Sequence, residues 1–177
     1  MPIIKKVKKL SKWVSLVEAK FYNYANDKPD VYYGLNLHDY VSVIAQNNKK
    51  EIILIKQFRP LINKYTIELP GGLKDKNISH YDAAKKELYE ETGFKIKTKM
   101  KFLCKNYIDI GRLNNQMYGY YAEINDFKEK KWLQEKGLTL IRIKPNKLLD
   151  LLLDGRIISA IHSNIIFCAF QKNVIRF

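Results

Sequence analysis

A strand that ends in a proline and two glycines, followed by a helix rich in glutamate, is the feature that most constrains this fold. The stretch 65–69 predicts a short strand, and Pro70-Gly71-Gly72 then breaks any regular element, so a loop is expected next. Ser79 can cap a helix whose interior, 83–91, consists mostly of good helix formers, and Gly93 supplies a C-terminal stop. The pattern therefore predicts a strand–loop–helix unit.

Three glutamates on this helix are candidate metal ligands. Glu87, Glu90 and Glu91 are spaced by three and four residues, so their side chains project to neighbouring positions. At about 100° per residue, Glu87 and Glu91 lie only about 40° apart, beside the apolar stripe that includes Leu88. Magnesium prefers oxygen ligands, so carboxylates at the edge of a core can hold the ion against a diphosphate. The alternative interpretation is a solvated acidic face.

The rest of the chain alternates strand and helix patterns. The predicted strands are 40–45, 51–58, 94–110, 116–124 and 138–143. A polar turn is expected at 111–115 and a charged loop at 125–136. The predicted later helices are 145–153 and 157–171. Upstream, 13–33 predicts an antiparallel piece with a turn at 26–30.

Composition favours one globular domain with a basic surface. The 177 residues are 46% hydrophobic, which is enough for the core of one main domain. Lys and Arg exceed Asp and Glu by 32 − 18 = +14, so anionic partners are plausible. Because the lysines are scattered, nucleic acid is a possible partner but not a favoured one.

Other classes of protein lack support in the sequence. Cys104 and Cys168 are far apart in the sequence and indicate neither a disulfide framework nor a zinc site. His38, His80 and His162 have no metal-type spacing, so we expect each to be structural or exposed. The early lysines are followed by no apolar signal segment, and no stretch approaches the roughly 18 apolar residues of a membrane span. We therefore expect a cytoplasmic protein with no membrane association.

The loop and helix together resemble the Nudix box. Gly72 is followed by five residues, position 78, seven residues, and then the run KELYEETGF at 86–94. The family pattern has Glu where this chain has Ile78 and Arg where it has Lys86, whereas the later glutamates and both glycines are kept. In the family that Glu and Arg commonly form an ion pair. Losing both together therefore indicates that a supporting contact has been replaced.

The resemblance extends to the ADP-ribose pyrophosphatase branch of that family. The segments 57–60 and 65–73 are similar to an Arg-Pro strand end and an E-[LF]-P-A-G segment of this branch. By this likeness Arg59 and Leu73 would bind substrate, although Arg59 could instead be a surface or sheet-edge charge.

The same likeness implies the metal ligands. Glu87 and Glu91 would be the principal ones, Glu90 would assist, and the carbonyl of Gly71 would help. Two or three Mg²⁺ or Mn²⁺ ions are implied.

The family layout also suggests residues outside the box. Trp13 is the candidate to stack on the nucleobase, frequently across a dimer interface, with Tyr32 or Tyr33 on the opposite face. Core packing is the alternative for Trp13. A further catalytic glutamate is expected in the late loop, where Glu135 is the candidate and Glu129 its rival, and either could simply be solvated.

The resemblance implies an α/β fold: a Nudix-type α/β/α sandwich with a central mixed sheet. Residues 1–37 would form a β-rich dimerisation segment and 38–177 the hydrolase domain. The expected function is metal-dependent cleavage of the pyrophosphate bond of ADP-ribose or a related nucleotide sugar by a homodimer, with Glu87, Glu91 and Glu135 as catalytic residues. Action on capped RNA or a dinucleotide, and a non-catalytic nucleotide-binding module, are the alternatives.

Overall fold

A mixed sheet of eight strands forms the body of the protein. The computed structural model describes residues 2–128 and 132–176. Its central path runs β11–β5–β4–β10–β8, with β6 on β5, β7 on β4 and β9 on β10. The strands are β4 (Tyr40–Gln46), β5 (Ile52–Arg59), β6 (Lys64–Glu68), β7 (Gly71–Leu73), β8 (Phe94–Ile96), β9 (Lys101–Tyr107), β10 (Gln116–Lys128) and β11 (Thr139–Ile143). Because β10 pairs with β4 in parallel while the other pairs are antiparallel, the predicted mixed sheet is confirmed.

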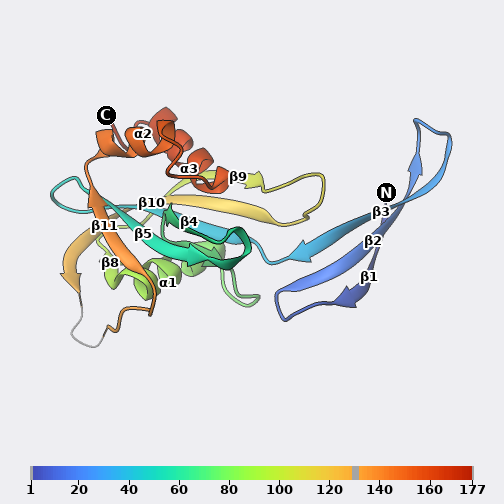
Figure 1. The fold of residues 1–177 in the computed structure, drawn as a ribbon, viewed down its shortest axis with the longest axis horizontal. Helices are drawn as coiled ribbons and strands as arrows, with labels where there is room; N and C mark the ends of the chain where they lie inside the picture. Colours follow the sequence, from blue (N-terminus) through green and yellow to red (C-terminus); the bar gives the residue numbers. More distant parts are fainter. Residues whose placement is uncertain (1, 129–131, 177) are drawn as a thin grey trace.

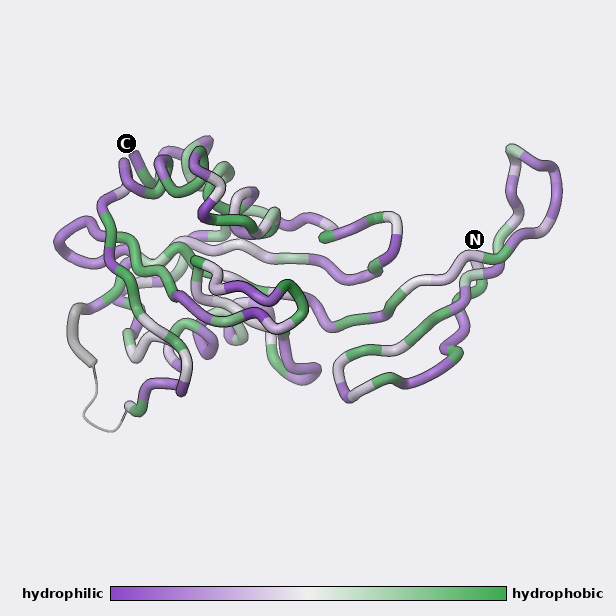
Figure 2. Tube along the Cα trace, in the orientation of Figure 1, coloured by the Kyte–Doolittle hydropathy of each residue, from purple (hydrophilic) through white to green (hydrophobic). Residues whose placement is uncertain are grey.

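Helices cover both faces of this sheet. Helix α1 (His80–Thr92) lies on one face, and α2 (Pro145–Leu153) and α3 (Ala160–Gln171) lie on the other (Figure 1). Alternation along β4 serves both layers, because Val41 and Val43 pack on the α1 side while Ile44 packs on the α2–α3 side. Figure 2 shows hydrophobic residues along the central strands and these two later helices. The predicted α/β/α sandwich is thus confirmed.

Helix α1 begins and ends where local signals place it. Ser79 Oγ accepts a hydrogen bond from the Asp82 N–H at 3.0 Å, which satisfies one of the free amides of the first turn. Gly93 ends the helix with φ +73°, a left-handed conformation that glycine adopts without strain, and donates its N–H to the Tyr89 carbonyl. These two ends fix which turn of the helix carries the glutamates.

The N-terminal strands form a separate three-stranded antiparallel sheet, which we call the arm. It consists of β1 (Ile3–Lys9), β2 (Val14–Asn23) and β3 (Lys28–Leu37), and it extends away from the body (Figure 1). The end of β3 is tied to the β9–β10 loop, since the Leu35 N–H donates to the Arg112 carbonyl at 2.8 Å. Strand β1 was not predicted, and the β2–β3 turn lies at 24–27, earlier than the predicted 26–30.

Several predicted boundaries are wrong. The single strand expected over 94–110 is divided into β8 and β9, because Ile96 pairs with Ile124 while Lys101 pairs with Tyr121, so residues 97–100 lie opposite only residues 122–123 of β10. The Gly-Gly stretch, expected to be a loop, forms β7 through its pairing with β4. Strand β10 continues to Lys128 into the expected loop, and α3 begins at Ala160, with Ser159 as its N-cap, later than predicted.

The described residues include no helix that is long and apolar enough to cross a membrane.

Candidate active site

The structure brings the two principal glutamates of α1 against the backbone of β7. Glu91 is only 8% exposed, and its Oε2 accepts the Gly71 N–H at 2.8 Å. Glu87 lies against the next residue, because a Cβ added at Gly72 would fall 2.5 Å from Glu87 Oε2. A side chain at position 72 would therefore displace the Glu87 carboxylate from its place beside β7. Strand β7 and helix α1 together form what we call the carboxylate corner.

The electrostatics of this corner indicate an excess of negative charge. Burial raises the pKa of Glu91 to about 8, opposed by the Gly71 hydrogen bond and assisted by the charges of Glu87, Glu135 and Glu68. Burial likewise raises the pKa of Glu87 to about 7, and the charge of Glu90 adds to the effect. Both carboxyl groups therefore hold their protons unusually tightly, because burial and neighbouring carboxylates disfavour the charged form, and a bound cation would reverse this effect.

The corner suits a hard divalent cation, although the protein alone does not complete a ligand set. Within residues 2–128 and 132–176, no group of three or more His, Cys, Asp or Glu side chains is arranged to hold a metal ion. Carboxylate and carbonyl oxygens are the donors that Mg²⁺ and Mn²⁺ accept, and Mg²⁺ usually takes only one or two carboxylates with waters and substrate phosphates completing its shell. Glu87, Glu91 and the Gly71 carbonyl fit that requirement.

The departures from the box pattern have a structural explanation. Lys86 Nζ lies 2.8 Å from Asp75 Oδ2 and 3.8 Å from Glu90, so it has an anionic partner other than position 78. Ile78 packs against the core beneath α1, and its carbonyl accepts the Lys74 ammonium at 2.9 Å. An ion pair from Lys86 to the loop is thus present with a different acidic residue.

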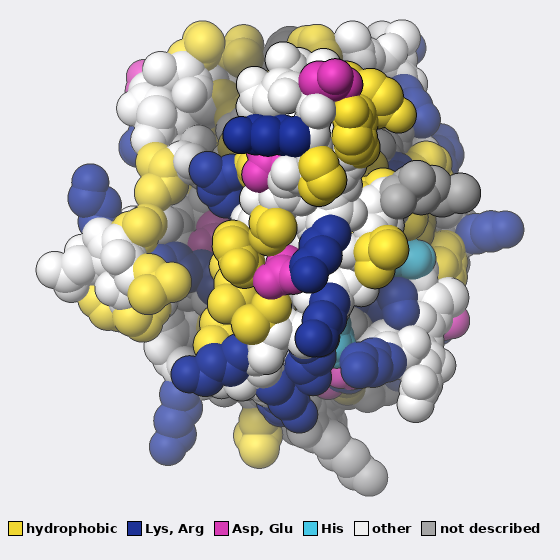
Figure 3. All heavy atoms as spheres, turned by 90° about the vertical axis from the view of Figure 1, so that its right-hand side faces the viewer, with side chains coloured by type: hydrophobic (Ala, Val, Ile, Leu, Met, Phe, Trp, Pro, Cys, Tyr) yellow, Lys and Arg dark blue, Asp and Glu magenta, His cyan; other side chains and the backbone are white. Residues whose placement is uncertain are grey.

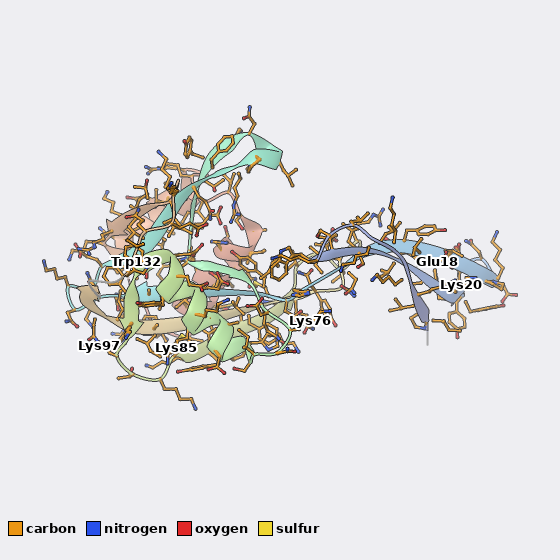
Figure 4. The ribbon with its side chains drawn as sticks, turned by 90° about the horizontal axis from the view of Figure 1, so that it is seen from below. Glu18, Lys20, Lys76, Lys85, Lys97 and Trp132 are labelled. Atoms are coloured by element: carbon orange, nitrogen blue, oxygen red, sulfur yellow. The ribbon has the colours of Figure 1, made fainter. Side chains whose placement is uncertain are left out.

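Glu90 occupies the outer side of the corner. Its side chain is 53% exposed and it approaches Lys86, consistent with an assisting role more than with that of a principal ligand. Its carbonyl accepts the Trp132 indole N–H at 3.1 Å, and a Cβ at Gly93 would fall 2.5 Å from the Trp132 ring. Figure 4 shows Trp132 beside α1, with Lys85 farther along the helix.

Trp132 therefore docks the late loop onto α1, a contact that the sequence interpretation missed because it expected only a charged loop there. Glu135 follows on this loop as an exposed side chain, and its charge raises the pKa of both Glu87 and Glu91. Its rival Glu129 lies outside the described residues. The structure thus brings Glu135 within electrostatic range of the corner, as the catalytic hypothesis requires.

Arg59 lies on the other side of the segment that leads into β7. Its guanidinium forms two hydrogen bonds to Glu68, at 2.7 and 2.6 Å, and Glu68 also accepts from Thr66. Burial opposes the ionisation of Glu68, but these hydrogen bonds outweigh it and lower its pKa, so the pair is charged. The Arg59 side chain is 43% exposed and lines a cavity of about 650 Å³ with Tyr40, Glu68 and His162. Arg59 is therefore pre-oriented by Glu68 at a cavity beside the corner.

The aromatic candidates lie apart from one another within a single chain. Trp13 is half-buried and packs edge-on against His38 at 5.0 Å, and the His38 Nδ1 donates to the carbonyl of Lys74 in the loop after β7. Tyr32 instead donates to the Gly111 carbonyl at 2.5 Å. Tyr33 points to the opposite face of the arm and donates to Glu18, so the two tyrosines cannot share one stacking site.

Leu73 completes β7 and pairs with Tyr40. It is half-buried at the edge of the sheet, one residue from Gly72 and the Glu87 carboxylate.

All three histidines have structural contacts, as expected. His80 lies 2.8 Å from Asp39 and stacks on Tyr118, and His162 is buried. The sequence gives no signal for a role of His162 in the site, because its partner Leu69 lies 93 residues away along the chain.

A strand–glycine–helix corner with paired glutamates, on an α/β/α sandwich, is the arrangement of one class of phosphate-bond hydrolases. The chain belongs to the Nudix family: the NUDIX domain model matches residues 36–140, more than half of its length.

Relatives of known sequence agree with this assignment. An ADP-ribose pyrophosphatase of Bacillus subtilis is 31% identical over 96 residues, covering 54% of this chain and 51% of that protein. An uncharacterized Nudix hydrolase of Schizosaccharomyces pombe is 36% identical over 85 residues, covering 48% of this chain and 41% of that protein. The chain thus spans about half the length, or less, of these curated relatives.

A solved structure described as an ADP compounds hydrolase superposes on the chain with a TM-score of 0.78. The match covers 97% of this chain and 93% of the other, at 22% sequence identity. This likeness shows that the whole fold, arm included, is shared.

Proposed function

We propose that this protein hydrolyses the pyrophosphate bond of a nucleoside diphosphate derivative with the help of a divalent metal ion, and that ADP-ribose or a related nucleotide sugar is its substrate. The observation that carries the proposal is the approach of two carboxylates, the buried Glu91 and the half-buried Glu87, to the β7 backbone. Their raised pKa values indicate a site that lacks positive charge. The similarity to an ADP-ribose pyrophosphatase supports the substrate class.

In the proposed reaction, separate residues bind the metal ion, activate the attacking water and bind the substrate. Glu87, Glu91 and the Gly71 carbonyl would hold Mg²⁺ or Mn²⁺, with Glu90 assisting from the solvent side. The ion, when bound, neutralises diphosphate charge and acidifies water. Glu135 orients the attacking water and accepts its proton, and no covalent enzyme intermediate is needed. Arg59 donates to the substrate from the neighbouring cavity, and Leu73 contacts it from β7, where it pairs with Tyr40 of the cavity wall.

The arm is proposed to form a homodimer interface. It exposes large apolar side chains on strands that make few contacts with the body, including Ile3, Ile4, Val31, Tyr32 and Tyr33. A second subunit packed on this surface would also bring the arm's aromatic residues near a carboxylate corner, where Trp13 or Tyr32 could stack on the base. Residues 1–37 are thus proposed as the dimerisation segment of a hydrolase domain at 38–177.

Capped RNA or a dinucleotide is the second candidate substrate, and the net charge of +14 favours it. Figure 3 shows Lys and Arg side chains spread over the arm-side face of the molecule, between apolar patches. Phosphate-rich polymers would be attracted to such a face, whereas a single nucleotide sugar does not require it.

A substrate panel with matched variants tests the proposal. ADP-ribose, other nucleotide sugars, a dinucleoside polyphosphate and capped RNA are incubated with Mg²⁺ or Mn²⁺ and the wild-type protein, Glu87→Gln or Glu123→Gln. Glu123 is an exposed residue of β10 and serves as the control. We expect ADP-ribose turnover that Glu87→Gln reduces at least a hundredfold and Glu123→Gln leaves unchanged. Selective cleavage of capped RNA would establish the alternative, and binding without products would show a non-catalytic module.

A further inference from the structure

Residues 68–71, which connect β6 to β7, each form at least one hydrogen bond to another part of the chain. They run from the cavity lined by Arg59 and Glu68 to the carboxylate corner. At its start Glu68 accepts from Arg59, and the Leu69 N–H donates to His162 Nδ1 at 2.7 Å. The Pro70 carbonyl accepts from the Val43 N–H at 2.9 Å and from Ser42 Oγ at 2.8 Å. At its end the Gly71 N–H donates to Glu91. The Leu69 N–H, the Pro70 carbonyl and the Gly71 N–H are thus consecutive anchor points, and Pro70, with its fixed φ, limits how Leu69 and Gly71 can move relative to each other. The position of Gly71 against Glu91 thus depends on what holds Leu69.

His162 holds it from a distant part of the chain. It lies on α3, is 2% exposed, and is separated from Leu69 by 93 residues. It also lies beyond the stretch 36–140 that matches the NUDIX domain. The corner is therefore tied to a helix that contributes no ligand of its own.

The geometry fixes the state of the imidazole ring. Since Nδ1 accepts the Leu69 N–H, the ring proton is on Nε2, which faces Tyr40 Oη at 3.4 Å and Glu68 Oε2 at 3.8 Å. Burial lowers the pKa of His162 to about 4, so the ring is neutral in the physiological range. A neutral ring with Nδ1 as acceptor is the form that can hold a backbone amide.

We propose that His162 is a positioning residue for the metal site: by accepting the Leu69 N–H it sets the place where Gly71 meets Glu91. This inference rests on the proposed function of the carboxylate corner. Groups that hydrogen-bond directly to metal ligands typically change metal affinity by about 10- to 100-fold when they are lost. His162 acts one stage further out, through Leu69 and Pro70, so we expect an effect at the lower end of that range. Loss of the Leu69 contact should therefore weaken metal binding even though His162 touches no metal ligand.

Two polar substitutions separate positioning from simple packing. His162→Asn places an amide oxygen near the Nδ1 position, where it can still accept the Leu69 N–H. His162→Gln reaches toward the Nε2 position and leaves that N–H without its acceptor. Ile165→Val is the control for core packing, because Ile165 is a fully buried residue of the same helix without a polar contact to make.

The experiment is a calorimetric titration of the full-length proteins with Mn²⁺ in the absence of substrate, accompanied by the Mn²⁺ dependence of ADP-ribose hydrolysis. We expect His162→Asn and the Ile165→Val control to bind Mn²⁺ within about threefold of wild type, and His162→Gln to bind it at least about tenfold more weakly. Thermal melts establish that each variant is folded.

Equal Mn²⁺ affinity in folded His162→Asn and His162→Gln would overturn the role of His162 while leaving the proposed function intact. Failure of the wild-type protein to bind Mn²⁺ would overturn the metal site itself, and with it this role.

Discussion

Replacing Glu91 with Gln should remove most activity and yet stabilise the metal-free protein at neutral pH. Burial raises the pKa of Glu91 from 4.5 to about 8. The folded protein therefore holds this proton more tightly than the unfolded chain does, and the free energy of unfolding falls as the pH rises from about 4.5 to about 8. A Gln side chain has no such proton, so the variant escapes this loss.

The expected gain in the free energy of unfolding follows from the size of the shift in the pKa of Glu91. At pH 7 the protein is 7 − 4.5 = 2.5 pH units above the ordinary pKa, and at 1.36 kcal/mol per unit this corresponds to about 3 kcal/mol. Solvent screening reduces it little, because Glu91 is 8% exposed. The amide oxygen of Gln can still accept the Gly71 N–H, so that contact is kept. We expect a net gain of about 1 to 3 kcal/mol, well above the roughly 0.2 to 0.5 kcal/mol of an exposed like-charge pair.

Urea unfolding in EDTA at pH 5, 6, 7 and 8 measures this gain. The difference between Glu91→Gln and wild type should be under about 1 kcal/mol at pH 5 and should grow toward pH 8, whereas Glu123→Gln should follow wild type throughout. Added Mn²⁺ should raise the melting temperature of wild type more than that of Glu91→Gln. A difference that does not change with pH, or a variant less stable than wild type at pH 7, would refute the reasoning.

Three further substitutions test other parts of the site. Gly72→Ala should weaken metal-dependent activity at least tenfold, since its Cβ would fall 2.5 Å from Glu87 Oε2; an unchanged Mn²⁺ dependence of turnover would contradict that contact. Trp13→Ala should raise KM for an ADP-sugar far more than it lowers kcat if the ring stacks on the base, whereas unchanged KM with a loss of about 3 to 5 kcal/mol of stability would assign it to packing. Restoring Ile78→Glu and Lys86→Arg together should be tolerated better than either alone in a double-mutant cycle, and simple additivity would show that the two positions do not interact.

Local signals in the sequence were sufficient for helix α1 and its glutamates. Ser79 and Gly93 mark the ends of the helix chemically, so the positions of Glu87 and Glu91 relative to the core followed from helix geometry alone. The layers of the sandwich followed from the family resemblance and from strand and helix periodicity. These features depend on residues close together in the chain.

The features that were missed depend on distant partners. Strand β7 exists because its backbone pairs with β4, although Pro70-Gly71-Gly72 resembles a break in regular structure. The break between β8 and β9 arises from their register on β10, which leaves no mark in the hydrophobic pattern. The contacts of Trp132 with α1 and of His162 with Leu69 join segments tens of residues apart. Only the folded arrangement identifies such residues as parts of one site.

Product analysis of ADP-ribose is the most direct test of the central claim, that this chain is a metal-dependent pyrophosphatase built on Glu87 and Glu91. The wild-type protein is incubated with ADP-ribose and Mg²⁺ or Mn²⁺, with an EDTA-treated sample alongside, and the products are separated chromatographically. The claim predicts AMP and ribose 5-phosphate in equal amounts, formed only with the metal and lost in Glu87→Gln. Intact ADP-ribose with every metal, or the same products in EDTA, would contradict it.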